Sequence, residues 1–227
     1  MSKFIDLLGR VGEQAPAPIG FGAVSQHEGD VPSMALIGEL TVTEATKKRG
    51  VREAKVDALL LSPLRSMGKK SLDNLSKSLE GRLWGARVGQ IDAVFAAQLR
   101  EAGCDFIVFD AEKAAGAILN NEEPGKIITI NHDLSEEVAQ AIQGLPIEGA
   151  FLFPKEGLLP LTVQKLIDLQ IVRGLLDKPF VMTAPPQMDS ADLEAFRNAG
   201  IEGLLLPVFP TEALNSTRDA LLNLSRR

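Results

Sequence analysis

A short pattern that occurs four times constrains the fold of this chain more than any other feature. In each copy an acidic residue near the start is followed by an uninterrupted run of apolar residues. The copies occupy residues 56–63, 102–110, 147–154 and 201–208. The regular recurrence of one strand-like segment along the chain predicts a repeating architecture.

Further apolar runs lie between these copies, and together they predict eight strands separated by helical segments. We expect strands near 34–39, 57–62, 84–88, 105–110, 126–131, 149–153, 180–184 and 203–207. Helix starts are indicated by the N-cap candidates Thr43, Ser135, Asp189 and Thr211. Strands that are apolar throughout need cover on both faces, which favours an α/β fold with a parallel sheet closed into a (β/α)8 TIM-like barrel. An open doubly wound sheet is the alternative, but the first strand is not followed by a Gly-x-Gly-x-x-Gly turn.

The first 33 residues form a predicted N-terminal arm, and residues 34–227 form the predicted barrel. Apolar residues at helical spacing in 3–11 indicate a helix, followed by a proline-rich connector at 15–18, a short strand at 19–22 and a polar loop at 23–32. We expect the helix to cover one end of the barrel. A contact between two copies of the chain is the alternative.

Charge and composition favour small-molecule partners. The net charge is −6 and both signs are interleaved, so the basic stripe typical of nucleic-acid binders is missing. No apolar run approaches the length of a membrane span, and Asp6 and Gly9 interrupt the N-terminal run before it could form a signal peptide. The single cysteine, Cys104, lies at the start of a strand and is interpreted as a core residue. We therefore expect a cytoplasmic protein with no nucleic-acid or membrane partner; a homo-oligomer is possible.

Active sites of such barrels lie at the carboxyl ends of the strands. The acidic residues at the strand beginnings, Asp57, Asp105, Glu148 and Glu202, are therefore expected to support the fold. The polar residues at the opposite ends are the candidates for chemistry: Glu39, Ser62, Arg87, Gln90, Asp110, Glu112, Asn131, His132, Asp133, Lys155, Glu156 and Thr183.

Arg87 is the most informative candidate, because a guanidinium among apolar strand positions is costly unless it meets an anion. We expect it to bind a substrate carboxylate or phosphate, with Asn131 and Glu39 as further substrate-binding residues. The alternative is an internal salt bridge from Arg87 to Asp110 or Glu39.

Asp110, His132 and Lys155 are the predicted catalytic residues. Asp110 is favoured because the other three copies of the repeat end in or beside proline. His132 is a plausible general acid or base, and Lys155 could form a Schiff base with a carbonyl substrate. For His132 a loop residue beside a helix start, and for Lys155 a solvated loop position, are the alternatives. No metal is assigned, although a divalent ion held by Glu39, Asp110, Glu112 and His132 is possible.

These residues favour a small-molecule enzyme, in particular an aldolase-type lyase acting on a carboxylate- or carbonyl-bearing metabolite. A barrel without catalysis, serving binding or assembly, is the alternative. Residues 102–116 are similar to a segment of the flavin-dependent nitronate monooxygenases, which implies a flavin oxidoreductase as a further option. That family's glycine pair and histidine are missing from the segment, and prolines occupy the loops after strands seven and eight, where phosphate groups bind in many barrels. A flavin is therefore not expected.

Overall fold

The computed structural model describes residues 2–12, 32–47, 51–79, 81–153 and 158–224. Eight parallel strands form a closed barrel in chain order. The strands are β1 (Ala35–Leu40), β2 (Ala58–Leu64), β3 (Trp84–Val88), β4 (Phe106–Phe109), β5 (Gly125–Ile130), β6 (Gly149–Leu152), β7 (Phe180–Thr183) and β8 (Gly203–Pro207). The expected barrel is confirmed, and each strand lies within two residues of its predicted bounds.

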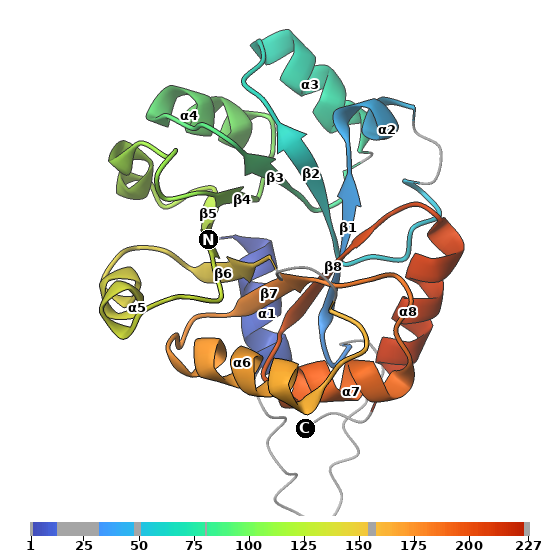
Figure 1. The fold of residues 1–227 in the computed structure, drawn as a ribbon. Helices are drawn as coiled ribbons and strands as arrows, with labels where there is room; N and C mark the ends of the chain where they lie inside the picture. Colours follow the sequence, from blue (N-terminus) through green and yellow to red (C-terminus); the bar gives the residue numbers. More distant parts are fainter. Residues whose placement is uncertain (1, 13–31, 48–50, 80, 154–157, 225–227) are drawn as a thin grey trace, which may run out of the picture.

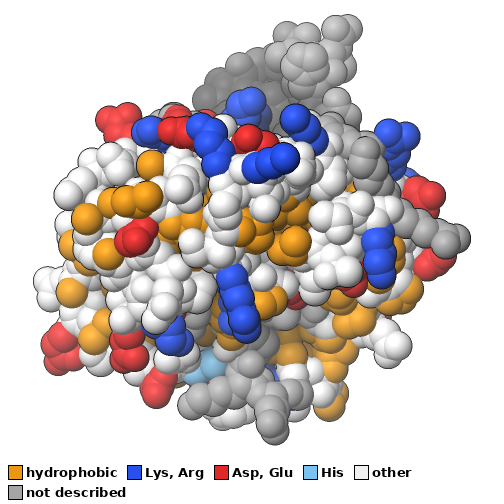
Figure 2. Space-filling view, turned by 90° about the horizontal axis from the view of Figure 1, so that it is seen from above, with side chains coloured by type: hydrophobic (Ala, Val, Ile, Leu, Met, Phe, Trp, Pro, Cys, Tyr) orange, Lys and Arg blue, Asp and Glu red, His pale blue; other side chains and the backbone are white. Residues whose placement is uncertain are grey.

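Helices surround the barrel (Figure 1), most of them connecting successive strands, and the last helix follows β8. They are α2 (Val42–Thr46), α3 (Lys69–Ser78), α4 (Ala93–Glu101), α5 (Glu136–Gln143), α6 (Val163–Gly174), α7 (Ser190–Asn198) and α8 (Thr211–Asn223). Between β4 and β5 the connection carries a short 3₁₀ helix, η1 (Gly116–Asn120). None of the described helices has the length and apolar character needed to cross a bilayer. On the face seen in Figure 2, Lys and Arg side chains are interspersed with Asp and Glu.

A helix before the first strand, α1 (Lys3–Gly12), closes the amino-terminal end of the barrel (Figure 1). Phe4 and Leu8 are fully buried and pack with the side chains that fill the barrel interior. The Phe4 ring stacks on Phe106 of β4, with 4.1 Å between the ring centroids. A Cβ atom added at Gly125 would lie 2.6 Å from the Cβ of Ser2, so this strand position needs glycine to admit the helix. The expectation that the N-terminal helix covers one end of the barrel is confirmed.

Three of the four repeated acidic residues hold the start of the preceding strand. The carboxylates of Asp57, Glu148 and Glu202 accept the backbone N–H groups of Leu36, Lys126 and Phe180, each at 2.8 Å. Each also pairs with a cation, in the pairs Asp57–Arg218, Glu148–Lys126 and Glu202–Arg173. These side chains act as structural supports, as expected from their place at the strand beginnings.

Asp105 departs from this arrangement because it serves the N-terminal helix. Its carboxylate accepts the Ser2 hydroxyl at 2.7 Å and the backbone N–H groups of Lys3 and Phe4 at 3.1 and 2.9 Å. A carboxylate at the first turn of a helix satisfies amide groups that lack a partner within the helix. The second copy of the repeat therefore attaches α1 to the barrel.

Two of the four predicted helix starts are wrong. Ser135 and Asp189 cap α5 and α7, but α2 is capped by Thr41 and Thr43 lies inside it. The Thr41 hydroxyl accepts the Glu44 backbone N–H while the Glu44 carboxylate accepts that of Thr41, a reciprocal pair that selects this threonine. Thr211 is the first residue of α8, and Pro210 precedes it. The predicted connector at 15–18, the strand at 19–22 and nearly all of the loop at 23–32 lie outside the described residues.

Candidate functional site

Side chains that point into the barrel form layers, each contributed by alternate strands. The strand register and the alternation of side chains along each strand define these layers. The last apolar layer before the carboxyl ends of the strands comes from the even strands. It contains Leu60, Val108, Phe151 and Leu205. The next, from the odd strands, contains Glu39, Arg87, Thr129 and Thr183 and is here called the polar layer. Above it the even strands contribute the rim layer, Ser62, Asp110, Phe153 and Pro207.

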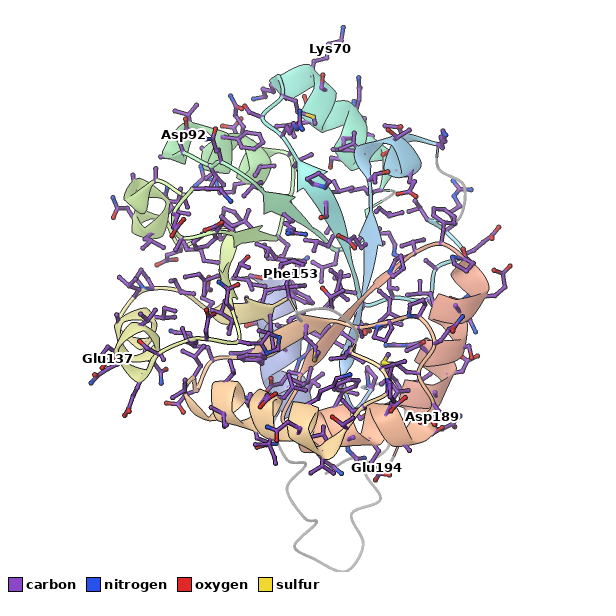
Figure 3. All side chains as sticks on the ribbon, viewed as in Figure 1. Lys70, Asp92, Glu137, Phe153, Asp189 and Glu194 are labelled. Carbon is purple, nitrogen blue, oxygen red and sulfur yellow. The ribbon has the colours of Figure 1, made fainter. Side chains whose placement is uncertain are left out.

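Arg87 extends across the mouth of the barrel rather than pairing with an acid. Its guanidinium carbon lies 3.9 Å from the centre of the Phe153 ring. Phe153 follows β6 and is labelled over the middle of the barrel in Figure 3. Arg87 is half-buried, and its guanidinium makes no hydrogen bond or ion pair with the described residues. The alternative of an internal salt bridge to Asp110 or Glu39 is therefore wrong. One face of the cation is covered by an aromatic ring, while its N–H groups have no acceptor in the part of the chain that the structure describes.

Thr183 and Glu39 lie in the same layer and also lack polar partners. The Thr183 hydroxyl oxygen is buried and is without a hydrogen-bond partner, and no other buried side-chain N or O atom among the described residues shares this property. The half-buried Glu39 carboxylate makes no hydrogen bond or ion pair with the described part of the chain. The polar layer thus contains a cation, an anion and a hydroxyl whose side chains make no hydrogen bond or ion pair with the described residues.

Asp110 lies at the mouth but is engaged by a local partner. Its carboxylate forms an ion pair of 2.8 Å with Lys113 and accepts the Glu112 backbone N–H at 3.1 Å. These two hydrogen bonds lower the pKa of Asp110 below its usual value, so the group stays ionised at neutral pH. The same ion pair raises the pKa of Lys113, and the nearby Arg87 guanidinium opposes that rise. Two cations therefore share this side of the mouth.

The remaining candidates are less closely grouped. Asn131 is exposed and His132 is half-buried in the turn that follows β5. Lys155 and Glu156 lie outside the described residues. Ser62 is buried at the end of β2, while Gln90, Glu112 and Asp133 are exposed. Among the described residues no three His, Cys, Asp or Glu side chains form a group that could hold a metal ion, so Glu39, Asp110, Glu112 and His132 do not form the metal site considered from the sequence.

Two members of the site were missed from the sequence. Thr129 is in the polar layer because it follows the inward-facing Ile127 by two positions on β5. Phe153 follows the inward-facing Phe151 in the same way. The alternation of side chains could have identified both residues, since it shows which positions point inward once the strand bounds are known.

Two surface hollows lie at the opposite end of the barrel. One, of about 350 Å³, includes Arg82 and Asp105, and the other, of about 550 Å³, includes Lys126, Glu148 and Lys178. Their charged side chains already have partners: Arg82 donates to three backbone carbonyls, and Lys126 pairs with Glu148. Lys178 donates to the Ile147 carbonyl at 2.6 Å. These hollows are therefore weaker candidates for a ligand-binding site than the mouth of the barrel.

The closed barrel, its connecting helices and the polar mouth define the class: the chain has the (β/α)8 TIM-barrel fold. No family model matches the chain, and no curated protein matches it in sequence. Among solved structures it is similar to KGPDC from Streptococcus mutans, with 14% identity, a TM-score of 0.61, and coverage of 83% of this chain and 97% of that one.

Two further similarities show the same fold. The HpcH/HpaI aldolase from Desulfitobacterium hafniense is 12% identical, with a TM-score of 0.56 and coverage of 85% of this chain and 94% of that one. The tryptophan synthase alpha subunit from Campylobacter jejuni is 12% identical, with a TM-score of 0.55 and coverage of 84% and 96%. At these identities the similarities establish the architecture, and function must be argued from the site.

Proposed function

We propose that the barrel mouth binds a small carboxylate-bearing metabolite and that the protein is an enzyme acting on it, a lyase of aldolase type. The observation that carries the proposal is Arg87, an inward-facing guanidinium that rests on Phe153 and has no counter-ion among the described residues. Withdrawing a guanidinium from water costs free energy unless an anion accepts its hydrogen bonds. A planar carboxylate matches the N–H fork of arginine.

A carboxylate fits this mouth better than a phosphate group. Phosphate sites in TIM barrels commonly use backbone N–H groups after strands seven and eight. Here Pro185 and Pro186 follow β7, and Pro207 and Pro210 lie at and after the end of β8, where they provide no N–H donor. The same absence of donors argues against the phosphate of a flavin.

A retro-aldol cleavage is the reaction we propose. A base removes the hydroxyl proton of a hydroxy-oxo acid. The bond between the hydroxyl-bearing carbon and the carbon next to the oxo group then breaks, and an aldehyde leaves. The bonding electrons form an enolate of the oxo acid, which is then protonated. Because the hydrogen bond from Lys113 lowers the pKa of Asp110, this carboxylate is a weaker base, and the proposal assigns the proton transfer to Glu39 in the polar layer and His132 beside the mouth. Stabilisation of the enolate by Lys155 belongs to the same proposal.

The names of the neighbours are compatible with this reaction class, since one of them is an aldolase. The proposal itself rests on the mouth. A cytoplasmic location and small-molecule partners remain part of it.

A binding protein without catalysis is the second candidate. It is favoured by the ion pair that engages Asp110 and by the lack of a metal-holding group among the described residues. It predicts the same ligand at Arg87 and no turnover.

Binding and turnover can be tested separately. Calorimetric titration with pyruvate, as the simplest 2-oxo acid, should show binding to the unaltered protein and its loss in Arg87→Met. Arg100→Met, on the outer helix α4, is the matched control and should bind as the unaltered protein does. A ligand at 100 times its dissociation constant raises the free energy of unfolding by about 2.7 kcal/mol, so thermal shifts provide an independent readout.

Aldehyde release from 4-hydroxy-2-oxo acids, measured with and without added Mg²⁺ or Mn²⁺, then separates the two candidates. Release that depends on Arg87 supports the lyase, whereas pyruvate binding without release supports the binding protein. If neither pyruvate nor any other 2-oxo acid binds, the proposed ligand class is wrong.

A further inference from the structure

We infer that Thr183 is the specificity-determining donor of this site and that the ligand is a short 2-oxo monocarboxylate. In this arrangement Arg87 binds the carboxylate and the Thr183 hydroxyl donates a hydrogen bond to the adjacent oxo oxygen. The inference rests on the proposed function, which supplies the carboxylate at Arg87. It adds the second contact, the charge of the ligand and its size.

The Thr183 hydroxyl is a buried polar group that points to a missing partner. Its oxygen is buried and has no hydrogen-bond partner among the described residues. Every other buried side-chain N or O atom of those residues has one. Buried polar groups in proteins are almost always paired, and an unpaired one at a site commonly meets its partner in function. Thr183 is the last residue of β7 and follows the inward-facing Val181 by two positions, so its side chain points into the mouth.

Thr183 and Arg87 come from opposite sides of the barrel. β7 lies opposite β3 in the ring of strands, and both residues belong to the polar layer. The Arg87 side chain crosses part of this separation, because its guanidinium stacks on Phe153. Phe153 follows β6, the strand hydrogen-bonded to β7. The guanidinium thus lies against a side chain that follows the strand next to β7. In the inferred arrangement one small ligand contacts both Arg87 and Thr183.

The charged and apolar side chains around Arg87 and Thr183 restrict the charge and size of the ligand. Glu39 adds to the same layer a carboxylate that has no ion pair with the described residues, whereas the Asp110 carboxylate at the rim is already paired with Lys113. A second negative charge on the ligand would therefore meet repulsion. Below the polar layer lie four apolar side chains, Leu60, Val108, Phe151 and Leu205. A short apolar tail would face this floor without desolvating a polar group.

The test compares pyruvate with propionate, which has the same carboxylate and no oxo oxygen. In Thr183→Val we expect pyruvate to bind about tenfold more weakly, as for loss of one hydrogen bond, while propionate binding is unchanged. Thr183→Ser keeps a hydroxyl and should restore the preference for pyruvate. Because the hydroxyl has no partner, Thr183→Val should also keep or raise the melting temperature of the free protein.

Thr217→Val is the matched control for stability. Thr217 is also buried, but its hydroxyl donates to the Ala213 carbonyl at 3.1 Å. We expect this variant to lower the melting temperature and leave the pyruvate-to-propionate ratio unchanged.

Glu39→Gln tests the charge argument, with oxaloacetate as the dianionic probe. The unaltered protein should bind pyruvate more tightly than oxaloacetate, and the variant should reduce that preference.

The outcomes distinguish this inference from the proposed function. If pyruvate binds through Arg87 but Thr183→Val lowers pyruvate and propionate affinity equally, or lowers neither, the role of Thr183 is overturned and the carboxylate site stands. If oxaloacetate binds the unaltered protein more tightly than pyruvate, the monocarboxylate assignment is overturned. If no carboxylate binds at all, the proposed function fails first.

Discussion

The guanidinium of Arg87, from β3, lies 3.9 Å from the centre of the Phe153 ring, beyond the end of β6. This contact joins two strands that are not neighbours in the barrel. A cation over an aromatic face gains electrostatic attraction from the ring. It also limits the directions in which the N–H groups of Arg87 can point, so Phe153 orients the proposed carboxylate-binding group.

Replacing Phe153 should weaken the ligand site more than the fold. In Phe153→Leu we expect pyruvate affinity to fall about two- to fivefold, because a cation–π contact contributes about 0.5 to 1 kcal/mol at an accessible site. Calorimetric titration measures the change. Phe153→Tyr keeps an aromatic ring and should bind normally; equal affinity in the leucine variant would show that the contact has no orienting role.

The N-terminal helix should be an integral part of the barrel. Phe4→Ala should lower the free energy of unfolding by about 3 to 5 kcal/mol, because it removes a fully buried ring that stacks on Phe106 and leaves a cavity. Urea unfolding gives the value. Leu7→Ala, at a half-buried position of the same helix, is the control and should cost clearly less. Similar small losses in both variants would contradict the packing of α1 into the barrel.

Glu202 should make stability fall as the pH rises. Burial raises the pKa of this carboxyl, although the Arg173 ion pair and the Phe180 backbone N–H act in the opposite direction. The folded protein therefore binds the proton more tightly than the unfolded chain, whose glutamate pKa is about 4.3. The contribution of Glu202 is fully present below that pH and is lost as the pH rises through the raised folded pKa.

Glu202→Gln provides the comparison, because glutamine does not titrate. The stability of the unaltered protein minus that of the variant should decrease as the pH rises from about 4.3 to the folded pKa and should then stay constant. Urea unfolding at a series of pH values measures this difference. A difference that grows with pH would show that the ion pair with Arg173 outweighs burial.

Cys104 should be inert in the folded protein. The thiol is buried, and burial raises its pKa, so the reactive thiolate is scarce at neutral pH. A thiol reagent such as DTNB at pH 8 should label the native protein only as fast as it unfolds, and should label one thiol at once in guanidinium chloride. Rapid labelling under native conditions would contradict this.

The strands could be predicted well because burial on both faces leaves a continuous apolar run in the sequence. β2, with Ala58 to Leu61 all buried, is an example. Helix starts were less certain. Thr41 and Thr43 are equally suitable residue types, and the reciprocal contact between Thr41 and Glu44 decides between them. Choices of this kind depend on backbone geometry that residue type does not specify.

The candidate site was only partly predictable for the same reason. Arg87, Glu39 and Thr183 were found because they lie at or near the carboxyl ends of apolar strands. Asp110 was also found, but its ion pair with Lys113 depends on a turn that the pattern does not reveal. The support that Phe153 gives to Arg87 joins residues far apart in the chain and has no local signal.

The sequence by itself determined the order of strands and helices, the end of the barrel where polar residues gather, and the structural role of the repeated acids. These follow from local burial and from the direction of the chain. Only the tertiary structure decided that Glu39, Arg87, Thr129 and Thr183 share one layer and that Asp105 holds the N-terminal helix. The physical reason is that the height of each strand in a closed barrel is set jointly by the hydrogen-bond registers of all its neighbours, which no single segment of sequence contains.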